Sequence, residues 1–252
     1  MGKSLGGTVF IRNATEFDYC IRETILCLQD FCDKVVVLDA GSTDNTKDLI
    51  LDVINGKTKV IELTNDDWFS QTGKQKLAYF TNVAIEHLDT DYHFCLQADE
   101  ILHEKSYEIV RDAIESGSEV VMCSRINLWG SPYMKLSVPQ ERKPCSTQVI
   151  RLAKTKYRSM DDSENLGAFP SFGFYQDIRI YHMGFVRKRE VMKAKITHIQ
   201  KDVFQTEPDT KLNGMDIFNP YAWFDKEKDL TPIDEPLPKI IQQWAKERVY
   251  KD

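Results

Sequence analysis

The sequence contains no run of about 18 consecutive apolar residues, the minimum length for a helix that crosses a membrane. Its amino-terminal segment, MGKSLGGTVFIRN, enters a strand-like stretch without the apolar core and cleavage site of a signal peptide. These two absences predict a cytoplasmic protein without integral membrane association.

Cysteine spacing typical of a metal site is also missing. No two cysteines form a Cys-x-x-Cys pair, and no set of cysteine and histidine residues has the spacing of zinc ligands. The cysteines are scattered through apolar segments, which predicts that they are reduced residues of the core: Cys20, Cys27, Cys32, Cys95, Cys123 and Cys145.

Glycine-rich phosphate-binding motifs are absent as well. No G-x-G-x-x-G follows a strand-like segment, and Gly73-Lys74 lacks the preceding glycine of a Walker loop. Dinucleotide-dependent oxidoreductases and P-loop enzymes are therefore disfavoured.

Positive charge is in deficit, with 33 lysine and arginine residues against 39 aspartate and glutamate residues and a formal net charge of −6. This balance argues against a surface that binds nucleic acid or anionic lipid everywhere. The stretch 187–195 (RKREVMKAK) is a local exception, because five of its nine residues are basic. Such a stretch is usually a solvated helix face, and it can also contact the phosphates of a donor, a lipid or a nucleic acid.

Apolar residues make up 42% of the 252 residues, which is enough for one large α/β domain or two small ones. Strand-like and helix-like segments alternate through the first half of the chain. We predict strands at 8–11, 34–39, 59–63, 92–96 and 119–124, and helices that begin at Thr15, follow Ser42, and cover about 74–88 and 106–115. This order predicts a mostly parallel, doubly wound sheet flanked by helices.

The pattern is less regular after Arg125. Strands are predicted near 148–153 and 177–183, with glycine- and serine-containing loops between them. Prolines interrupt the carboxyl-terminal region, which ends in a predicted helix with Ile240, Ile241, Trp244 and Ala245 on one face.

Polar residues cluster where the predicted strands end. Asn13 follows the first strand, residues 39–44 (DAGSTD) follow the second, and Asp99-Glu100 follows the fourth. Ligands bind at this edge of an open parallel sheet. Taken singly, each cluster has a plainer interpretation, because Asp39 and Asp44 suit a turn and a helix cap and Asp99-Glu100 suits a solvated strand end.

The combination of a strand, Asp-Ala-Gly-Ser-Thr-Asp-Asn-Thr and a helix with a later strand closed by Ala98-Asp99-Glu100 resembles the family 2 glycosyltransferases, which have the GT-A fold. The resemblance covers about residues 7–125, and 181–185 (YHMGF) is similar to a later family segment that often carries a histidine. It implies a nucleotide-sugar-binding half, 1–125, and an irregular acceptor half with a carboxyl-terminal helical tail, 126–252, in one compact unit. The implied activity is metal-dependent, inverting transfer of a sugar from a nucleotide sugar, expected to be a UDP sugar, to an acceptor hydroxyl.

The resemblance also implies a site for Mn²⁺ or Mg²⁺. Asp99 is the expected main ligand and His182 the second, although an isolated histidine is more often structural. The family's metal motif reads Asp-x-Asp, and Gln97 stands here at its first position. A glutamine accepts a hydrogen bond or coordinates weakly through its carbonyl, but it brings no charge.

By the same resemblance, Asp39 accepts a hydrogen bond from the base, Asn13 lines the base or ribose pocket, and Arg12 lies along the base. Lys74 and Lys76 are expected to supply cations near the diphosphate. The expected nucleotide-sugar-binding residues are Arg12, Asn13, Asp39, Gly41, Ser42, Asp44, Lys74, Lys76, Gln97 and Ala98.

An inverting transfer needs a carboxylate that accepts the proton of the acceptor hydroxyl. Four acidic residues after the metal motif are candidates, and the sequence ranks Asp162 and Glu164 ahead of Asp161 and Asp177.

Two other functions remain open. Gln97 suggests a catalytically silent protein that binds a nucleotide sugar, and the same fold supports nucleotidyl transfer, although that chemistry usually requires a Gly-rich basic loop after the first strand. The acceptor is equally open: a glycan, a lipid-linked glycan, a protein or a modified nucleic acid, the last of which would use the basic stretch 187–195.

Overall fold

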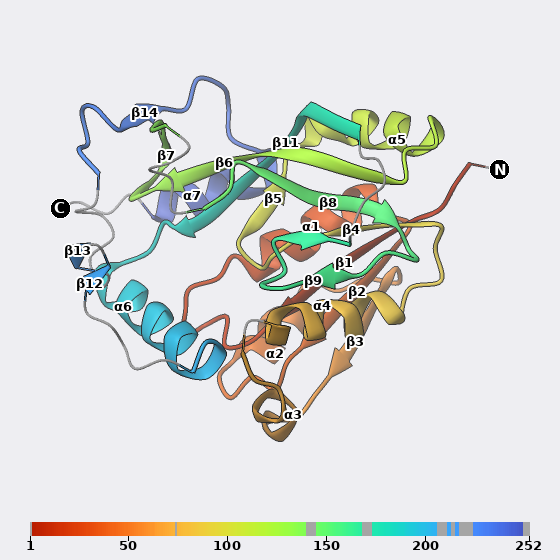
Figure 1. Cartoon of the computed structure of the whole chain (residues 1–252), viewed down its shortest axis with the longest axis horizontal. Coiled ribbons are helices and arrows are strands. Elements are labelled where there is room, and N and C mark those ends of the chain that lie inside the picture. The colour runs from red at the N-terminus through yellow and green to blue at the C-terminus, as the bar shows by residue number, and fades with distance from the viewer. Residues whose placement is uncertain are drawn as a thin grey trace.

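The computed structural model describes residues 2–73, 75–139, 145–167, 173–205, 211–212, 215–216 and 224–248. Within these residues, ten strands form one mixed sheet that helices cover on both faces (Figure 1). The predicted α/β fold is confirmed. None of the helices in the described part of the chain combines the length and the apolar character needed to cross a bilayer.

Four parallel strands form the amino-terminal side of the sheet, in the order β3-β2-β1-β4. They are β1 (Leu5–Ile11), β2 (Lys34–Asp39), β3 (Thr58–Glu62) and β4 (Tyr92–Cys95). The helices between them are α1 (Ile21–Phe31), α2 (Thr46–Leu51), α3 (Asn65–Ser70) and α4 (Gln75–Glu86).

The strand β2 is buried on both faces, as its β-branched sequence predicts. Val35 and Val37 pack in the same apolar cluster as residues of α1, whereas Val36 and Leu38 pack with residues of α3 and α4. Alternate side chains of one strand therefore join two helical layers to the sheet.

The remaining strands extend the same sheet through one parallel pair and several antiparallel pairs. These are β5 (Glu100–Leu102), β6 (Val120–Trp129), β7 (Ser131–Leu136), β8 (Gln148–Lys154), β11 (Gly173–Phe185) and β14 (Leu230–Pro232). The helices of this part are α5 (Tyr107–Glu115), α6 (Arg189–His198) and α7 (Gln242–Glu247). A 3-10 turn precedes α5 at Glu104–Ser106 and α7 at Lys239–Ile241, and a π-helical turn continues α6 at Ile199–Val203. Two short pairs stand apart: β9 (Ser159–Met160) with β10 (Asn165–Leu166), and β12 (Lys211–Leu212) with β13 (Met215–Asp216).

The strand predicted at 119–124 differs from expectation in its pairing. It forms β6, which does not pair with β4, because β8 lies between the two strands and is antiparallel to both. On its other side, β6 is parallel to β11. The parallel order therefore ends at β4. The proposed boundary near residue 125 falls inside β6, and the sheet runs through both halves.

The helix predicted to begin at Thr15 begins instead at Ile21. Residues 14–18 form turns, because Thr46 Oγ1 accepts a hydrogen bond from the Ala14 amide and Asp44 accepts one from the Glu16 amide. These bonds tie the loop to the start of α2. They bring Phe17 to the edge of the sheet, where it lines the cavity described below.

His93 gives the fold a specific dependence on pH. It lies in β4 with no exposed surface, and burial lowers its pKa to about 3. In the unfolded chain, a histidine has its ordinary pKa of about 6.5. Between pH 6.5 and pH 3, the unfolded chain therefore binds a proton at His93 that the folded chain does not, so the free energy of unfolding falls as the pH falls through this range. We expect His93 alone to remove about 2 kcal/mol of unfolding free energy between about pH 7.5 and pH 5.

Urea unfolding of His93→Leu at both pH values checks this expectation. The variant should lose less stability on acidification than the wild-type chain, although it keeps the similar dependence that buried His182 adds in the same direction. An equal loss in both proteins would contradict the assignment.

Candidate functional site

A cavity of about 170 Å³ opens at the carboxyl ends of β1 and β4. This is the edge at which the sequence predicts the ligand site. Its lining includes Arg12, Gln97, Ala98, Asp99, Asp162 and His182 from the predicted set, together with Phe17, Tyr19, Trp68, Lys195 and His198.

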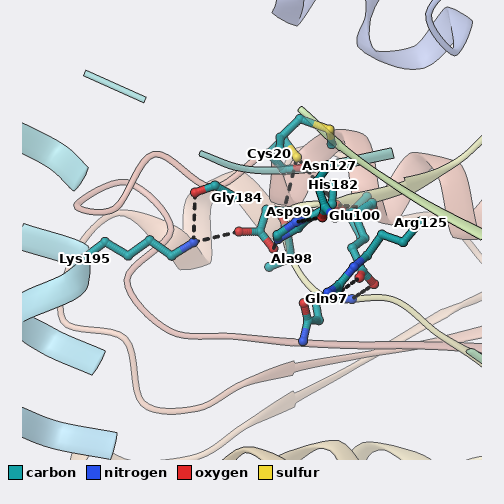
Figure 2. Close-up of polar contacts among 12 residues, drawn as sticks. Cys20, Gln97, Ala98, Asp99, Glu100, Arg125, Asn127, His182, Gly184 and Lys195 are labelled. Carbon is teal, nitrogen blue, oxygen red and sulfur yellow. Dashed lines mark hydrogen bonds and ion pairs between the residues drawn. The ribbon is translucent and has the colours of Figure 1, made fainter. Parts of the chain in front are cut away.

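Asp99 is the centre of the charged part of this cavity. Its side chain is almost fully buried, and Oδ2 accepts hydrogen bonds from Lys195 Nζ at 2.9 Å and Arg187 Nη2 at 3.1 Å. Figure 2 shows the Lys195 side chain extending toward Asp99, with a dashed line for their contact. Burial by itself raises the pKa of Asp99, but the charges of Lys195 and Arg187, together with the contact to His182, hold it well below its usual range. The carboxylate is therefore ionised.

His182 faces the other oxygen of Asp99. Its Nδ1 lies 2.9 Å from Asn127 Oδ1, and because an amide oxygen only accepts, Nδ1 carries the proton. Burial lowers the pKa of His182 to about 4, so the ring is neutral at pH 7 and Nε2 has a lone pair. Nε2 lies 3.7 Å from Asp99 Oδ1.

Two electron-pair donors thus face each other without a shared proton, an arrangement that suits a bound cation. A metal-binding histidine commonly donates its second ring N–H to a fixed acceptor, as His182 does to Asn127. The predicted pair Asp99 and His182 is therefore chemically suited to Mg²⁺ or Mn²⁺. Among the described residues no third His, Cys, Asp or Glu joins them, so further ligands would come from the nucleotide and water.

Gly184 makes room for this histidine. A Cβ atom at position 184 would lie 2.3 Å from His182 Nε2. Any other residue there would displace the ring from Asp99, which explains the glycine in the YHMGF segment.

Glu100, the neighbour of Asp99, has a structural role. It has no exposed surface, and its carboxylate accepts hydrogen bonds from Arg151 Nε at 2.7 Å and Nη2 at 2.8 Å, and from Arg125 Nη1 at 3.3 Å. It also accepts one from the Gln97 amide at 3.1 Å. Burial opposes its ionisation, but the two arginines lower the pKa of Glu100 to about 2. This network fixes the loop that carries Asp99.

The same network corrects the ranking of Glu164 as a candidate base. Arg125 binds both carboxylate oxygens of Glu164 at 2.9 Å, so they are held in an ion pair rather than presented to an acceptor. Asp162 is the only one of the four candidates that lines the cavity with Asp99. Asp161 is exposed and lines a different groove, and Asp177 pairs with Arg179 on the surface.

The residues of the DAGSTD turn bond mainly to one another and to the end of β1. Asp39 accepts a hydrogen bond from the Ser42 amide at 2.8 Å, and Asn13 Oδ1 accepts one from the Thr43 amide at 2.9 Å. Asp44 accepts from the Thr46 amide at the start of α2. The plainer interpretation of a turn and a helix start therefore holds for Asp39 and Asp44, and their contact with a nucleotide stays a prediction.

Gly41 is required by this turn. Its φ is +75°, and a Cβ atom there would lie 2.2 Å from the Thr64 carbonyl oxygen. Ser42 holds the end of β1, because its hydroxyl accepts a hydrogen bond from the Asn13 amide at 2.9 Å. Both residues thus shape the site without lining the cavity.

A wall of flat side chains borders the other end of the cavity. The His198 ring is stacked between Phe17, at 4.7 Å, and Trp68, at 5.7 Å. The Arg12 guanidinium lies 5.0 Å from the Trp68 ring and bonds to the carbonyls of Ala40 and Gly41. Arg12 Nε and Trp68 Nε1 are buried without a hydrogen-bond partner in the described part of the chain. Stacking surfaces with unsatisfied donors suit a planar base.

Lys76 does not lie among the residues that line the cavity, and its expected role near the diphosphate stays a prediction. Its side chain is buried, its ammonium lies 4.0 Å from the Trp68 ring, and it donates to the Asp202 carbonyl at 2.9 Å. Burial lowers the pKa of Lys76 to about 8. Lys76 braces the aromatic wall and does not line the cavity with Asp99. Lys74 lies outside the described residues.

The basic stretch 187–195 supplies the cations at Asp99 instead. Arg187 is buried, donates to the carbonyls of Phe17, Met183 and Gly184, and lies 4.8 Å from the Tyr19 ring. Lys195 lies equally close to Tyr19, and burial together with Arg187 lowers its pKa to about 8 despite Asp99. The solvated-face interpretation is therefore wrong for these two residues.

Several of these residues were missed by sequence reasoning. Trp68 and His198 belong to no motif identified in the sequence. Asn127 gave no signal either, because its role depends on the register that places it beside His182 between β6 and β11. The stretch 187–195 carried the only available signal for Arg187 and Lys195.

The chain is similar to known glycosyltransferases. It is 22% identical over 236 residues to the SPbeta prophage-derived glycosyltransferase SunS of Bacillus subtilis strain 168, and equally to the glycosyltransferase SunS of Bacillus phage SPbeta. Each match covers 90% of this chain and 51% of the relative, so the chain spans about half the length of the curated relatives it matches. No protein-family model matches the chain. The predicted resemblance to glycosyltransferases is confirmed, whereas membership of family 2 stays a prediction.

Solved structures give weaker likenesses. S. aureus TarS 1–349 in complex with UDP-GlcNAc is 16% identical with a TM-score of 0.46, over 89% of this chain and 74% of TarS. Glucosyl-3-phosphoglycerate synthase from Mycobacterium tuberculosis, in complex with Mn²⁺, UDP and phosphoglyceric acid, is 15% identical with a TM-score of 0.42, over 62% and 57% of the two chains. Both scores lie below 0.5, so the fold assignment rests on the sheet topology described above.

Proposed function

We propose that this chain is a glycosyltransferase that moves a sugar from a nucleotide-sugar donor, expected to be a UDP sugar, to an acceptor hydroxyl. The single observation that supports it best is the cavity at the strand ends, which joins an ionised Asp99, a neutral His182 and a second carboxylate, Asp162, to an aromatic wall. The match to named glycosyltransferases agrees with this proposal.

Asp99 Oδ1 and His182 Nε2 are the atoms that would hold Mn²⁺ or Mg²⁺. Such an ion supplies charge neutralisation for the diphosphate as it leaves. Asn127 keeps His182 in the tautomer that leaves Nε2 unprotonated, and Gly184 leaves space for the ring.

Asp162 is the proposed general base. It lines the same cavity as Asp99, and it would accept the proton of the acceptor hydroxyl as the hydroxyl oxygen attacks the anomeric carbon. Attack on the face opposite the leaving diphosphate inverts the configuration at that carbon. The other end of the cavity is suited to orient the base of the nucleotide, because Phe17, Trp68 and Arg12 border it.

The acceptor is one of the four classes named from the sequence: a glycan, a lipid-linked glycan, a protein or a modified nucleic acid. Arg187 and Lys195 bond to Asp99 inside the protein. The basic stretch 187–195 is thus less suited to binding DNA than its composition suggests.

A screen of nucleotide sugars for thermal stabilisation tests the proposal. Uridine diphosphate sugars with Mn²⁺ should raise the melting temperature, because a ligand present at about 100 times its dissociation constant adds about 2.7 kcal/mol to the stability of the native state. If no nucleotide sugar shifts the melting temperature, the proposal is wrong.

Donor hydrolysis separates the enzyme from a silent binding protein, the alternative that Gln97 suggests. An enzyme should release free UDP from the stabilising donor in the presence of Mn²⁺. Stabilisation without any release of UDP would support the silent binder.

A further inference from the structure

Lys195 occupies an unusual position for a lysine on a surface helix. Only 12% of its side chain is exposed, it lines the cavity, and its ammonium lies 2.9 Å from Asp99 Oδ2. The helix α6 that carries it comes from the second half of the chain, whereas Asp99 follows β4 in the first half (Figures 1 and 2).

The charges around Asp99 leave an excess of one positive charge. Arg187 and Lys195 each contribute +1 and Asp99 contributes −1. The neighbouring Glu100 does not offset this excess, because Arg125 and Arg151 already bind its carboxylate. An excess positive charge in a largely buried cavity favours an anionic ligand.

Lys195 is better placed than Arg187 to meet that ligand. The Arg187 guanidinium is held by three backbone carbonyls in addition to Asp99. The Lys195 ammonium has three N–H donors, and it donates to Asp99 and to the Gly184 carbonyl at 3.5 Å, with the Tyr19 ring 4.8 Å away. Its stem is flexible, so the ammonium can turn toward the cavity without breaking its bond to Asp99.

We propose that Lys195 is a phosphate ligand for the donor, and that its ammonium bridges Asp99 and an oxygen of the diphosphate. This inference rests on the proposed function. In the transfer step, the bond between the anomeric carbon and the β-phosphate oxygen breaks with its electron pair on that oxygen. The acceptor oxygen forms the new bond to carbon and its proton goes to Asp162, while Lys195 stays protonated and offsets the charge that develops on the diphosphate.

Calorimetric titration with UDP and with uridine, both in the presence of Mn²⁺, tests the proposal. Lys195→Met should weaken UDP binding by about 10- to 100-fold, the value of one hydrogen bond to a charged group. Uridine has no phosphate, so its affinity should not change. Lys195→Arg keeps the charge and should recover most of the affinity for UDP.

Lys193→Met is the matched control, because Lys193 is an exposed lysine on the same helix. It should bind UDP as the wild-type chain does. Melting temperatures of all variants, measured without ligand, report whether the ion pair with Asp99 is needed for folding, and Lys195→Arg provides the comparison if Lys195→Met is unstable.

Two outcomes would overturn the inference and leave the proposed function standing: UDP affinity unchanged in Lys195→Met, or equal losses of UDP and uridine affinity, which would mean that Lys195 only positions α6. A wild-type chain that binds no UDP would overturn the proposed function itself, and the inference with it.

Discussion

Replacement of Asp162 by asparagine is expected to lower the rate of sugar transfer by about 100- to 10,000-fold, the usual contribution of a general base. Asparagine keeps the size of the side chain but cannot accept the proton of the acceptor hydroxyl. Asp162 lines the cavity and is not bound to Asp99 or to its cations, so UDP affinity should stay at the wild-type value. Transfer rates with the donor identified by the screen, together with UDP titration, measure both quantities.

Asp161→Asn is the matched control for this experiment. Asp161 is the adjacent aspartate, but it is exposed and lines a separate groove near Tyr79 and Met160. It should transfer sugar at the wild-type rate. A large loss of transfer in Asp161→Asn with normal transfer in Asp162→Asn would place the base in that groove, and a loss of UDP affinity in Asp162→Asn would assign it to donor binding.

Glu100→Gln is expected to lower the free energy of unfolding strongly. Replacement of Glu100 by glutamine removes the buried charge that compensates Arg151 and Arg125, and breaking a buried ion pair in this way costs about 3 to 5 kcal/mol. The loop that carries Asp99 should lose its fixed position at the same time, because the Gln97 amide donates to Glu100. Urea unfolding at neutral pH measures the change in unfolding free energy.

Glu119→Gln is the comparison, because Glu119 makes several ion pairs on the surface, with Lys154 and Lys156, where solvent screens them. Its effect on stability should be much smaller. The pKa of Glu100 is depressed to about 2, so its contribution is present above its unfolded pKa of about 4.3 and is lost as the pH falls toward 2. Equal effects of the two substitutions would contradict the network described here.

The sequence predicted the parallel part of the fold well because local patterns specify it. The buried run in β2 and the turn after it are both signalled by short segments, 34–39 and 39–44, and the structure places them where the patterns do. The antiparallel part was harder to predict. The insertion of β8 between β4 and β6 depends on pairing between distant segments, which leaves no local signal.

The candidate site shows the same difference between residues in local motifs and residues that only the fold brings together. Asp99 and His182 were predicted from motifs, and in the structure His182 Nε2 lies 3.7 Å from Asp99 Oδ1. Charge partners could not be predicted from spacing. Glu164 and Lys76 were given functional roles from sequence position, yet Glu164 binds Arg125 and Lys76 braces Trp68. Lys195 lies 96 residues from Asp99 in the chain, and only the fold brings the two together.

A crystal structure of the chain with UDP and Mn²⁺ would show where the donor binds. We expect the diphosphate in the cavity beside Asp99, with an oxygen within hydrogen-bond distance of Lys195 and the uracil base against Trp68. A nucleotide bound elsewhere on the protein, with this cavity unchanged, would contradict this expectation.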